Sequence, residues 1–240
     1  MKYLFTTLAI GDSYVDNAIE CYSKMSKVLD CDFNITTNRP VNKINNINFD
    51  YFELSKYSAD MPGFSFYLSL KSLALKYAID KGYDYVIYND ADWEIMESFS
   101  ENKIQQLFLH MKKNNYDMLF ERPAQIGYYK QHIEDCFFKE KLIDFNVFDH
   151  HLWDNAHCTN EQFLVFKVNW KFKLFVMKWE MFLWYSIANN LRSYPDGFDI
   201  GVSALEANMN YDYIEWLQIL RSCFKFKDKQ GNTHYRFYHA

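Results

Sequence analysis

The stretch KGYDYVIYNDADW, residues Lys81–Trp93, decides the fold. A lysine-glycine turn leads into a run of β-branched and aromatic residues, which predicts a buried parallel strand. The run ends at Asp90 and Asp92, at the carboxyl end of that strand, where open α/β sheets bind ligands. Residues i and i+2 of an extended segment point to the same side, so both carboxylates are expected to face one cation. A hard divalent cation held there can in turn hold a diphosphate.

An Asp-x-Asp spacing is common by chance, so the interpretation of Asp90 and Asp92 depends on their context. The alternative is a solvated turn between a strand and a loop, where Asn and Asp are frequent. The buried Tyr-Val-Ile-Tyr run directly before the pair favours the ligand site.

The segments around this strand alternate between strand-like and helix-like patterns of apolar residues. The alternation predicts one α/β domain over residues 1–240, with a mostly parallel central sheet, helices on both faces, C-terminal helices and a hairpin. Helix caps are expected from Asp12 or Ser13, from a capping box of Ser98 and Glu101, and from Asn169. The predicted strands are Tyr3–Ile10, Asp32–Thr37, Phe49–Leu54, the run ending at Asp90, Asp117–Phe120, Gln162–Val168 and the hairpin Phe224–Lys227 with Thr233–Tyr238. The predicted helices are Tyr14–Leu29, Phe66–Asp80, one carrying Ile104 to Met111, Asn169–Asn190, Ile200–Met209 and Tyr213–Cys223, with an irregular segment at Glu121–Asn160.

Composition narrows the class of protein. Aromatic residues make up 20% of the chain, which suits stacking surfaces for sugars or bases but is equally expected from an AT-rich genome. The formal net charge of −5 disfavours an extensive nucleic-acid-binding surface. The five cysteines have no Cys-x-x-Cys spacing and are typical of reduced thiols. The apolar run Tyr3–Ile10 is too short for a transmembrane segment, so a cytoplasmic protein is expected.

Lys71 is an independent clue. On a helical wheel Ser72, Lys76 and Asp80 form a polar arc, and Lys71 falls outside it on the apolar side. A charged group there needs a partner, either a carboxylate or a ligand phosphate. The alternative is a lysine whose stem lies along the core while its ammonium reaches water.

The turn after the first strand, Thr7–Asp12, lies beside the expected ligand crevice. The backbone from Thr7 through Ala9 to Gly11 and the Asp12 side chain could contact a nucleoside. Alternatively, Gly11 makes the turn and Asp12 only caps the following helix.

The stretch Asp149–Cys158 offers a competing site. His150 or His151, Asp154 and His157 could lie on one helical face and ligate zinc, although the spacing matches no strong zinc signature. A polar acceptor-binding loop with Trp153 as a sugar-stacking platform and His157 beside it is favoured over zinc, and a plain surface loop is equally compatible with the pattern.

Further residues could complete a site. Asp196 and Asp199 precede the predicted helix at Ile200, and Glu161 opens the strand at Gln162. Each could act as a base, a nucleophile or an acceptor ligand, or could simply cap a helix or lie in a solvated loop. His234, in the predicted hairpin, could fold back as a further metal ligand or be an ordinary strand residue.

With these residues in place, the chain resembles GT-A-type glycosyltransferases, and most of all the retaining family that includes the histo-blood-group transferases and their bacterial relatives. The residues that carry the resemblance are Phe5–Gly11, the helix of Lys71, and Tyr85–Asp92, in the first half of the chain. The resemblance implies a nucleotide-sugar donor, commonly a UDP-sugar, bound through Mn²⁺ or Mg²⁺ on Asp90 and Asp92, with Lys71 near the donor phosphates.

The second half departs from the family pattern. The family has an acidic residue in a histidine-rich tryptophan motif before a late helix, and Phe198–Gly201 occupies the comparable region here. Asp199 is therefore a candidate only, and a retaining or an inverting outcome stays open. Residues 1–120 are expected to bind the donor and residues 121–240 the acceptor. The basic residues Lys225, Lys227, Lys229 and Arg236 could close over the diphosphate or form a solvated hairpin face.

The leading hypothesis is a metal-dependent glycosyltransferase that moves a sugar to an unidentified hydroxyl acceptor, on a glycan or another molecule. One alternative is a sugar-phosphate nucleotidyltransferase, which usually has a glycine-rich phosphate loop, and Gly11–Tyr14 is a poor version of one. The other is a non-catalytic nucleotide- or glycan-binding module, which the presence of both aspartates disfavours.

Overall fold

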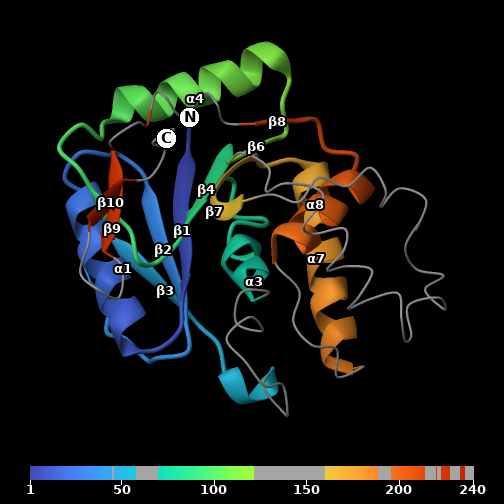
Figure 1. The fold of residues 1–240 in the computed structure, drawn as a ribbon, viewed down its shortest axis with the longest axis horizontal. Coiled ribbons are helices and arrows are strands. Elements are labelled where there is room, and N and C mark those ends of the chain that lie inside the picture. The colour runs from blue at the N-terminus through green and yellow to red at the C-terminus, as the bar shows by residue number, and fades with distance from the viewer. Residues whose placement is uncertain are drawn as a thin grey trace.

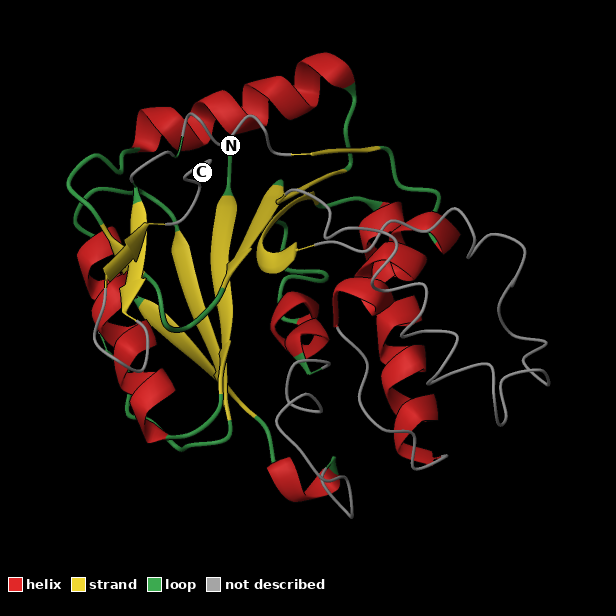
Figure 2. Ribbon diagram, in the orientation of Figure 1, coloured by secondary structure: helices red, strands yellow, loops and turns green. Residues whose placement is uncertain are grey.

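A twisted seven-stranded sheet forms the centre of the protein, with helices on both of its faces (Figures 1 and 2). In the computed structural model, the described residues are 1–44, 46–57, 70–121, 160–188, 196–213, 220, 223–227 and 233–235. The fold class predicted from the sequence is therefore confirmed. None of the helices in these residues is both long enough and apolar enough to cross a membrane.

The sheet has the strand order β3-β2-β1-β4-β7-β6-β8. Strands β1, β2, β3 and β4 run parallel, β7 runs antiparallel to both of its neighbours β4 and β6, and β8 is parallel to β6. Because β7 alone is reversed, its first residues lie beside the last residues of β4. The strands are β1 Tyr3–Ala9, β2 Asp32–Thr37, β3 Ile47–Tyr51, β4 Tyr85–Asn89, β6 Met118–Glu121, β7 Asn160–Lys167 and β8 Tyr211–Tyr213.

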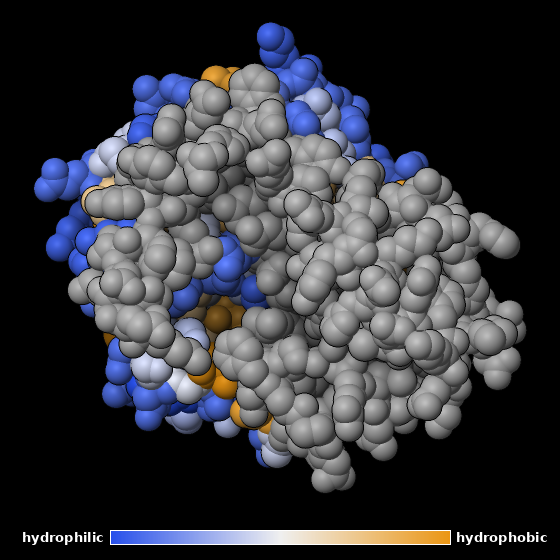
Figure 3. All heavy atoms as spheres, viewed as in Figure 1, coloured by the Kyte–Doolittle hydropathy of each residue, from blue (hydrophilic) through white to orange (hydrophobic). Residues whose placement is uncertain are grey.

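Each face of the sheet has its own layer of helices. Alternate strand residues such as Phe5 and Ile87 pack under α1 (Asp12–Met25) and α4 (Glu101–Asn114). The residues between them, such as Val86, pack under α3 (Lys71–Lys76), α7 (Trp170–Ala188) and α8 (Asp196–Glu206). The outer sides of α1 and α4 are mostly hydrophilic, at the left and top of Figure 3. Both faces are thus covered by helices, as a mostly parallel sheet requires.

A second, three-stranded sheet has the order β10-β9-β5. Its strands are β5 (Glu94–Ile95), β9 (Phe224–Lys227) and β10 (Thr233–Tyr235). The antiparallel β9–β10 hairpin was predicted, whereas the two-residue β5 was too short to be recognised from the sequence. Through β5, the C-terminal hairpin is attached directly after Asp92.

Several predicted boundaries were wrong. The third strand begins at Ile47, whose buried side chain lies beside Phe33 of β2, and Leu54–Lys56 forms a 3-10 turn, η1. Helix α8 begins at Asp196 and not at Ile200, and Gly197 in its first turn is buried. The helix expected from Tyr213 is wrong at its start, since Tyr213 pairs with Phe120 in the sheet. Residues 214–219 lie outside the described part of the chain.

Two of the predicted helix caps were also wrong. Helix α1 is capped by Gly11 and α4 by Ser100, and neither residue makes a side-chain capping bond. The Asp12 carboxylate contacts Arg39 instead. The Asn169 cap is confirmed, because its Oδ1 accepts a hydrogen bond of 3.0 Å from the Phe172 N–H at the start of α7.

Candidate donor-binding site

The candidate site lies at one edge of the sheet, where the parallel strands β1, β2 and β4 end and the antiparallel strand β7 begins. The register pairs Asn89 with Phe163, so the first residues of β7 extend past the end of β4. The Asp90 N–H donates a hydrogen bond of 3.0 Å to the Gln162 carbonyl. Asp90 is therefore fixed by backbone pairing at the carboxyl edge, where α/β sheets bind ligands.

Lys71 and Asp90 form an ion pair at this edge. Lys71 Nζ lies 3.0 Å from Asp90 Oδ1, and the two side chains are 5% and 20% exposed. The Tyr88 hydroxyl lies 3.3 Å from the same oxygen, and the Lys71 ammonium lies 5.6 Å from the Tyr88 ring centroid. The unusual position of Lys71 on the apolar side of its helix predicted such a partner, and the partner is a carboxylate. The polar arc assigned to that helix was wrong at Ser72, which is fully buried.

Asn89 supports the other face of the strand end. Its Oδ1 accepts a hydrogen bond of 3.0 Å from the Tyr22 hydroxyl of α1, and its Nδ2 donates to the Asp90 carbonyl at 3.0 Å. Both side chains are buried. The strand end is therefore held from α1 on one face and from Lys71 on the other, which makes the position of Asp90 rigid.

Asp92 has different surroundings. Strand β4 ends at Asn89 and Ala91–Asp92 form a turn, so the expected alternation does not extend to Asp92. The half-buried Asp92 lines a cleft of about 170 Å³ against α1, together with Glu20 and Glu94. Those two acids are paired with Lys24 at 2.6 Å and Lys225 at 3.1 Å. Within the described residues, no hydrogen bond or ion pair engages the Asp92 carboxylate.

These donors suit a hard cation. Carboxylate oxygens are the ligands that Mg²⁺ and Mn²⁺ prefer, and Asp92 supplies one that no described neighbour neutralises. Cys21 also lines the cleft, and burial raises the pKa of its thiol to about 12. No group of three or more candidate ligands occurs within the described residues. Water, the bound nucleotide or residues elsewhere in the chain would supply the remaining ligands of a cation.

The backbone brings the predicted ligand His234 towards this region. His234 pairs with Phe226 in the β9–β10 hairpin, and Lys225 of β9 pairs with Glu94, two residues after Asp92. The hairpin is therefore joined to the chain two residues after Asp92. The structure describes the backbone of His234 and not its side chain.

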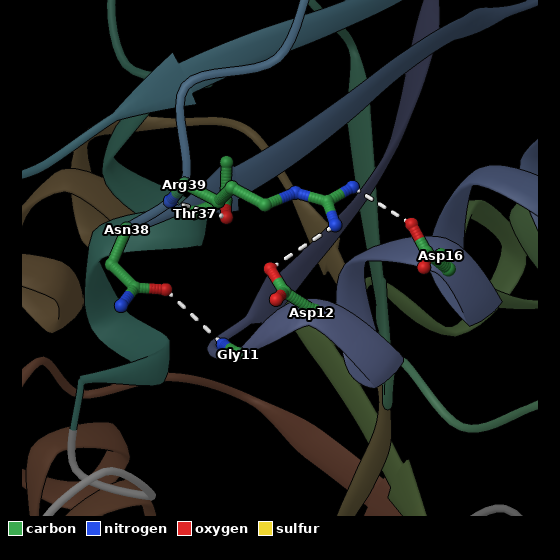
Figure 4. Close-up of polar contacts among 6 residues, drawn as sticks. All are labelled: Gly11, Asp12, Asp16, Thr37, Asn38 and Arg39. Carbon is green, nitrogen blue, oxygen red and sulfur yellow. Dashed lines mark hydrogen bonds and ion pairs between the residues drawn. The ribbon is translucent and has the colours of Figure 1, made fainter.

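Ion pairs of Arg39 lie at the neighbouring part of the edge, where β1 and β2 end. Arg39 contacts Asp12 Oδ1 through Nη1 at 3.2 Å and Asp16 Oδ1 through Nη2 at 2.8 Å. The Gly11 N–H donates to Asn38 Oδ1 at 3.2 Å (Figure 4). Figure 4 shows the Arg39 side chain extending from the end of β2 towards the first turn of α1. The Asp12 carboxylate is thus oriented by Arg39.

Two other predicted donor-binding residues are buried in the sheet. Thr7 and Ala9 are fully buried in β1, so their side chains do not reach the edge and a contact from this segment would come from the main chain. The Thr7 hydroxyl has no hydrogen-bond partner within the described residues. Gly11 has a φ of 89°, which leaves its N–H at the strand end and favours glycine there.

The predicted catalytic acids have mixed positions. Asp199 is buried, with an exposed fraction of 1%, and lies inside the first turn of α8 and not before the helix. Asp196 begins α8, and Glu161 lies on β7 next to Gln162, whose carbonyl binds Asp90. For Asp196 and Glu161 the structure describes the backbone only. Trp153, His157 and the zinc candidates His150, His151 and Asp154 lie outside the described residues.

Sequence analysis missed Arg39 and Gln162. Arg39 directly follows the end of the second predicted strand, so its position at the same edge was a usable signal. Gln162 gave no signal, because its place beside Asp90 depends on the antiparallel pairing of β7 with β4.

Comparison with known proteins supports the fold. No protein-family model and no curated protein matches the chain. The solved structure of galactosyltransferase LgtC in complex with donor and acceptor sugar analogs matches at a TM-score of 0.52 with 14% identity, covering 89% of this chain and 73% of that one. Mouse xyloside xylosyltransferase 1, in its apo form, gives a TM-score of 0.47 with 8% identity, covering 88% and 84%. The likeness to the galactosyltransferase and the strand order together confirm the GT-A-type glycosyltransferase fold that the sequence predicted.

Proposed function

We propose that the protein is a glycosyltransferase that moves a sugar from a nucleotide-sugar donor, most simply a UDP-sugar, to a hydroxyl group of an acceptor. The observation that carries the proposal is the buried Lys71–Asp90 ion pair at the carboxyl edge of a GT-A sheet. Desolvation of two charges makes a buried ion pair a weak source of stability. The Lys71 ammonium of such a pair can instead bind an anionic ligand.

Lys71 supplies positive charge to the departing nucleoside diphosphate. Its ammonium is almost fully buried, so its interaction with a phosphate oxygen is screened little by water. The bond between the anomeric carbon and the diphosphate breaks, the diphosphate keeps the electron pair, and a nearby cation stabilises the added charge. Tyr88 keeps the ammonium and the Asp90 carboxylate in place before the donor binds.

Asp90 and Asp92 would hold the cation, with His234 as a further ligand from the hairpin. A bound Mn²⁺ or Mg²⁺ would supply additional positive charge beside the diphosphate. Asp92 is suited to this role because no described neighbour neutralises it.

The nucleoside would lie over the ends of β1 and β2. Its contacts would come from the main chain between Thr7 and Gly11 and from the Asp12 carboxylate, which Arg39 orients. The galactosyltransferase of the same fold was solved with donor and acceptor sugar analogs, which supports a two-substrate site here.

The acceptor side of the proposal rests on residues 121–240. Glu161, next to the residue that binds Asp90, and the α8 residues Asp196 and Asp199 are the candidates to take the proton of the acceptor hydroxyl or to attack the donor sugar. Trp153 and His157 are proposed acceptor contacts. We assign no acceptor beyond the hydroxyl class.

The experiment is a donor screen in which nucleotide-sugars are incubated with the protein, with and without Mn²⁺, and release of nucleoside diphosphate is measured. Release from one donor that needs Lys71 supports the proposal, and the acceptor can then be sought with that donor. Release of pyrophosphate from a nucleoside triphosphate and a sugar phosphate would instead identify a nucleotidyltransferase. Binding of a nucleotide-sugar with no turnover in the presence of acceptor glycans would indicate a non-catalytic module.

A further inference from the structure

Helix α7 carries an apolar stripe that the described part of the chain leaves exposed. Trp170, Met177, Met181 and Trp184 are 66%, 55%, 38% and 47% exposed, and together they run along the helix. They account for four of the nine large hydrophobic residues that are exposed in the described part of the chain. Clustered exposure of this kind marks an interaction surface, whereas single exposed apolar residues do not.

The exposed stripe is not the core-facing side of α7. The opposite side of α7 is buried in the core through Phe172, Phe175, Val176 and Trp179. The helix is therefore apolar on both sides, a pattern expected of helices covered all round. Trp184 stacks on Tyr57, with ring centroids 5.3 Å apart, so one end of the stripe is already held in a fixed orientation.

The spacing of the stripe is symmetric. Trp170 and Trp184 lie seven residues before and after Met177. If a second copy of α7 runs antiparallel with Met177 on the two-fold axis, Trp170 of each copy lies opposite Trp184 of the other. A surface that complements itself under a two-fold rotation is what an isologous dimer requires. We propose that the protein forms a homodimer through antiparallel contact of the α7 stripes.

The charges beside the stripe are arranged in the same way. Lys173 lies opposite Met181 of the second copy in this arrangement and next to its Glu180. Lys173 pairs with Asp80 within its own chain, and Glu180 pairs with Lys76 at 2.8 Å. The dimer would therefore place alternating charges, Asp80, Lys173, Glu180 and Lys76, along each side of the contact, which fixes its orientation.

A lipid bilayer is the less suitable occupant. The lysines of α7 are each paired with an acid of the same chain: Lys171 with Asp117 at 2.8 Å, Lys178 with Glu206 at 2.7 Å and Lys173 with Asp80. The stripe is thus flanked by neutralised pairs and not by the excess of positive charge that draws an amphipathic helix to an anionic membrane.

The contact is small, so the dimer is expected to be weak. Covering the exposed parts of the four side chains removes roughly 400 Å² per copy, taking about 200 Å² for a fully buried large side chain. That is about half of the ~800 Å² per partner found in stable complexes. We therefore expect a monomer at low concentration and a dimer at high concentration.

The test is sedimentation velocity over a series from about 5 µM to about 500 µM, a range chosen for a contact below the standard size. The wild type is expected to shift towards a dimer as concentration rises. M177E puts two like charges on the two-fold axis and is expected to weaken dimerisation at least about tenfold. L109E is the matched control, because Leu109 is 58% exposed on α4, away from the stripe, and it should dimerise like the wild type.

The register is tested by oxidative cross-linking. M177C is expected to form a disulfide-linked dimer faster than the wild type, whose native cysteines give the baseline. W184C should not, because two copies of position 184 would lie about 21 Å apart along paired helices, far beyond disulfide reach. Thermal unfolding of each variant shows that it is folded.

The proposal is overturned if the wild type remains a monomer across the series, if L109E weakens the dimer as much as M177E, or if W184C cross-links as fast as M177C. It is also overturned if monomeric wild type sediments with phosphatidylglycerol vesicles and M177E does not, since the stripe would then bind lipid. None of these outcomes depends on the proposed enzymatic activity.

Discussion

Lys71 Nζ lies 3.0 Å from Asp90 Oδ1, and the pair joins the first residue of α3 to the residue that follows β4. The two residues belong to consecutive elements of the chain, and the contact forms because α3 packs against the end of that strand. It couples the stability of the fold to the site proposed for the donor diphosphate.

Replacing Lys71 alone should destabilise the protein. K71M leaves a mostly buried carboxylate without its partner, a change that costs about 3 kcal/mol for buried pairs and less here because Asp90 is partly exposed. The double variant K71M/D90N removes both charges and should recover most of this loss of unfolding free energy. Urea unfolding of the three proteins measures it, and an equal loss in the single and double variants would show that packing and not charge explains the effect.

The same variants separate stability from activity. K71M/D90N is expected to be nearly as stable as the wild type but to release nucleoside diphosphate from the donor at least about a hundredfold more slowly, because it lacks the cation at the leaving group. Turnover comparable to that of the wild type in the double variant would remove Lys71 from the mechanism.

Replacing Asp92, in contrast to replacing Lys71, should change nucleotide binding and not stability. Because no described neighbour pairs with its carboxylate, D92N is expected to change the unfolding free energy by less than about 0.5 kcal/mol, as for an ordinary surface substitution. Binding of a nucleoside diphosphate in the presence of Mn²⁺ should nevertheless weaken at least about tenfold. E97Q is the matched control, since Glu97 is an exposed acid a few residues away, and it should bind like the wild type.

Replacing Arg39 should weaken binding of the donor and leave the chemical step unchanged. Its ion pairs with Asp12 and Asp16 are exposed and screened by water, so R39Q is expected to leave the unfolding free energy almost unchanged. If Arg39 orients Asp12 towards the nucleoside, R39Q should raise KM for the donor several-fold with little change in kcat. Steady-state kinetics decide between this result and an unchanged KM, which would limit Arg39 to holding β2 against α1.

The carboxyl of Asp117 is expected to make the unfolding free energy depend on pH. Burial alone would raise the pKa of its carboxyl, but hydrogen bonds from Lys171, the Asn210 N–H and Asn169 outweigh that effect and lower the pKa below its usual range. A lowered pKa in the folded state adds stability that is complete above the unfolded pKa of about 3.9 and is lost as pH falls through the folded pKa.

The D117N variant removes this titration. It should be less stable than the wild type at pH 7 by about 1–3 kcal/mol, because a charged acceptor is lost from three partly buried hydrogen bonds. The difference should shrink as pH falls from about 4 to about 2, the range over which Asp117 is protonated. A difference in unfolding free energy that stays constant over that range would contradict the assignment.

The sequence predicted most of the fold because its signals are local. The apolar run before Asn89, the periodicity of α1 and the hairpin of β9 and β10 can each be recognised within a few residues. The cap at Asn169 follows from its side-chain chemistry. Short elements were missed because β5 has only two residues and β8 three, too few for a pattern to show.

The site was predictable only where one residue had an unusual position. Lys71 could be recognised because a lysine on an apolar helix face needs a partner. The contact between Asp90 and Gln162 could not, since it depends on one reversed strand in an otherwise parallel neighbourhood. The end of the strand was predicted to within one residue, but the turn at Ala91–Asp92 was not, so the alternation expected to bring Asp90 and Asp92 to one side does not extend to Asp92.

Calorimetric titration of UDP, GDP, CDP and dTDP into the wild type, D92N and K71M/D90N, each with and without Mn²⁺, tests the proposed nucleoside diphosphate site most directly. We expect that one nucleotide binds the wild type in the presence of Mn²⁺, that D92N loses the dependence on Mn²⁺, and that K71M/D90N binds at least about tenfold more weakly. Equal binding to all three proteins, or no binding to the wild type, would contradict a nucleoside diphosphate site at Lys71, Asp90 and Asp92.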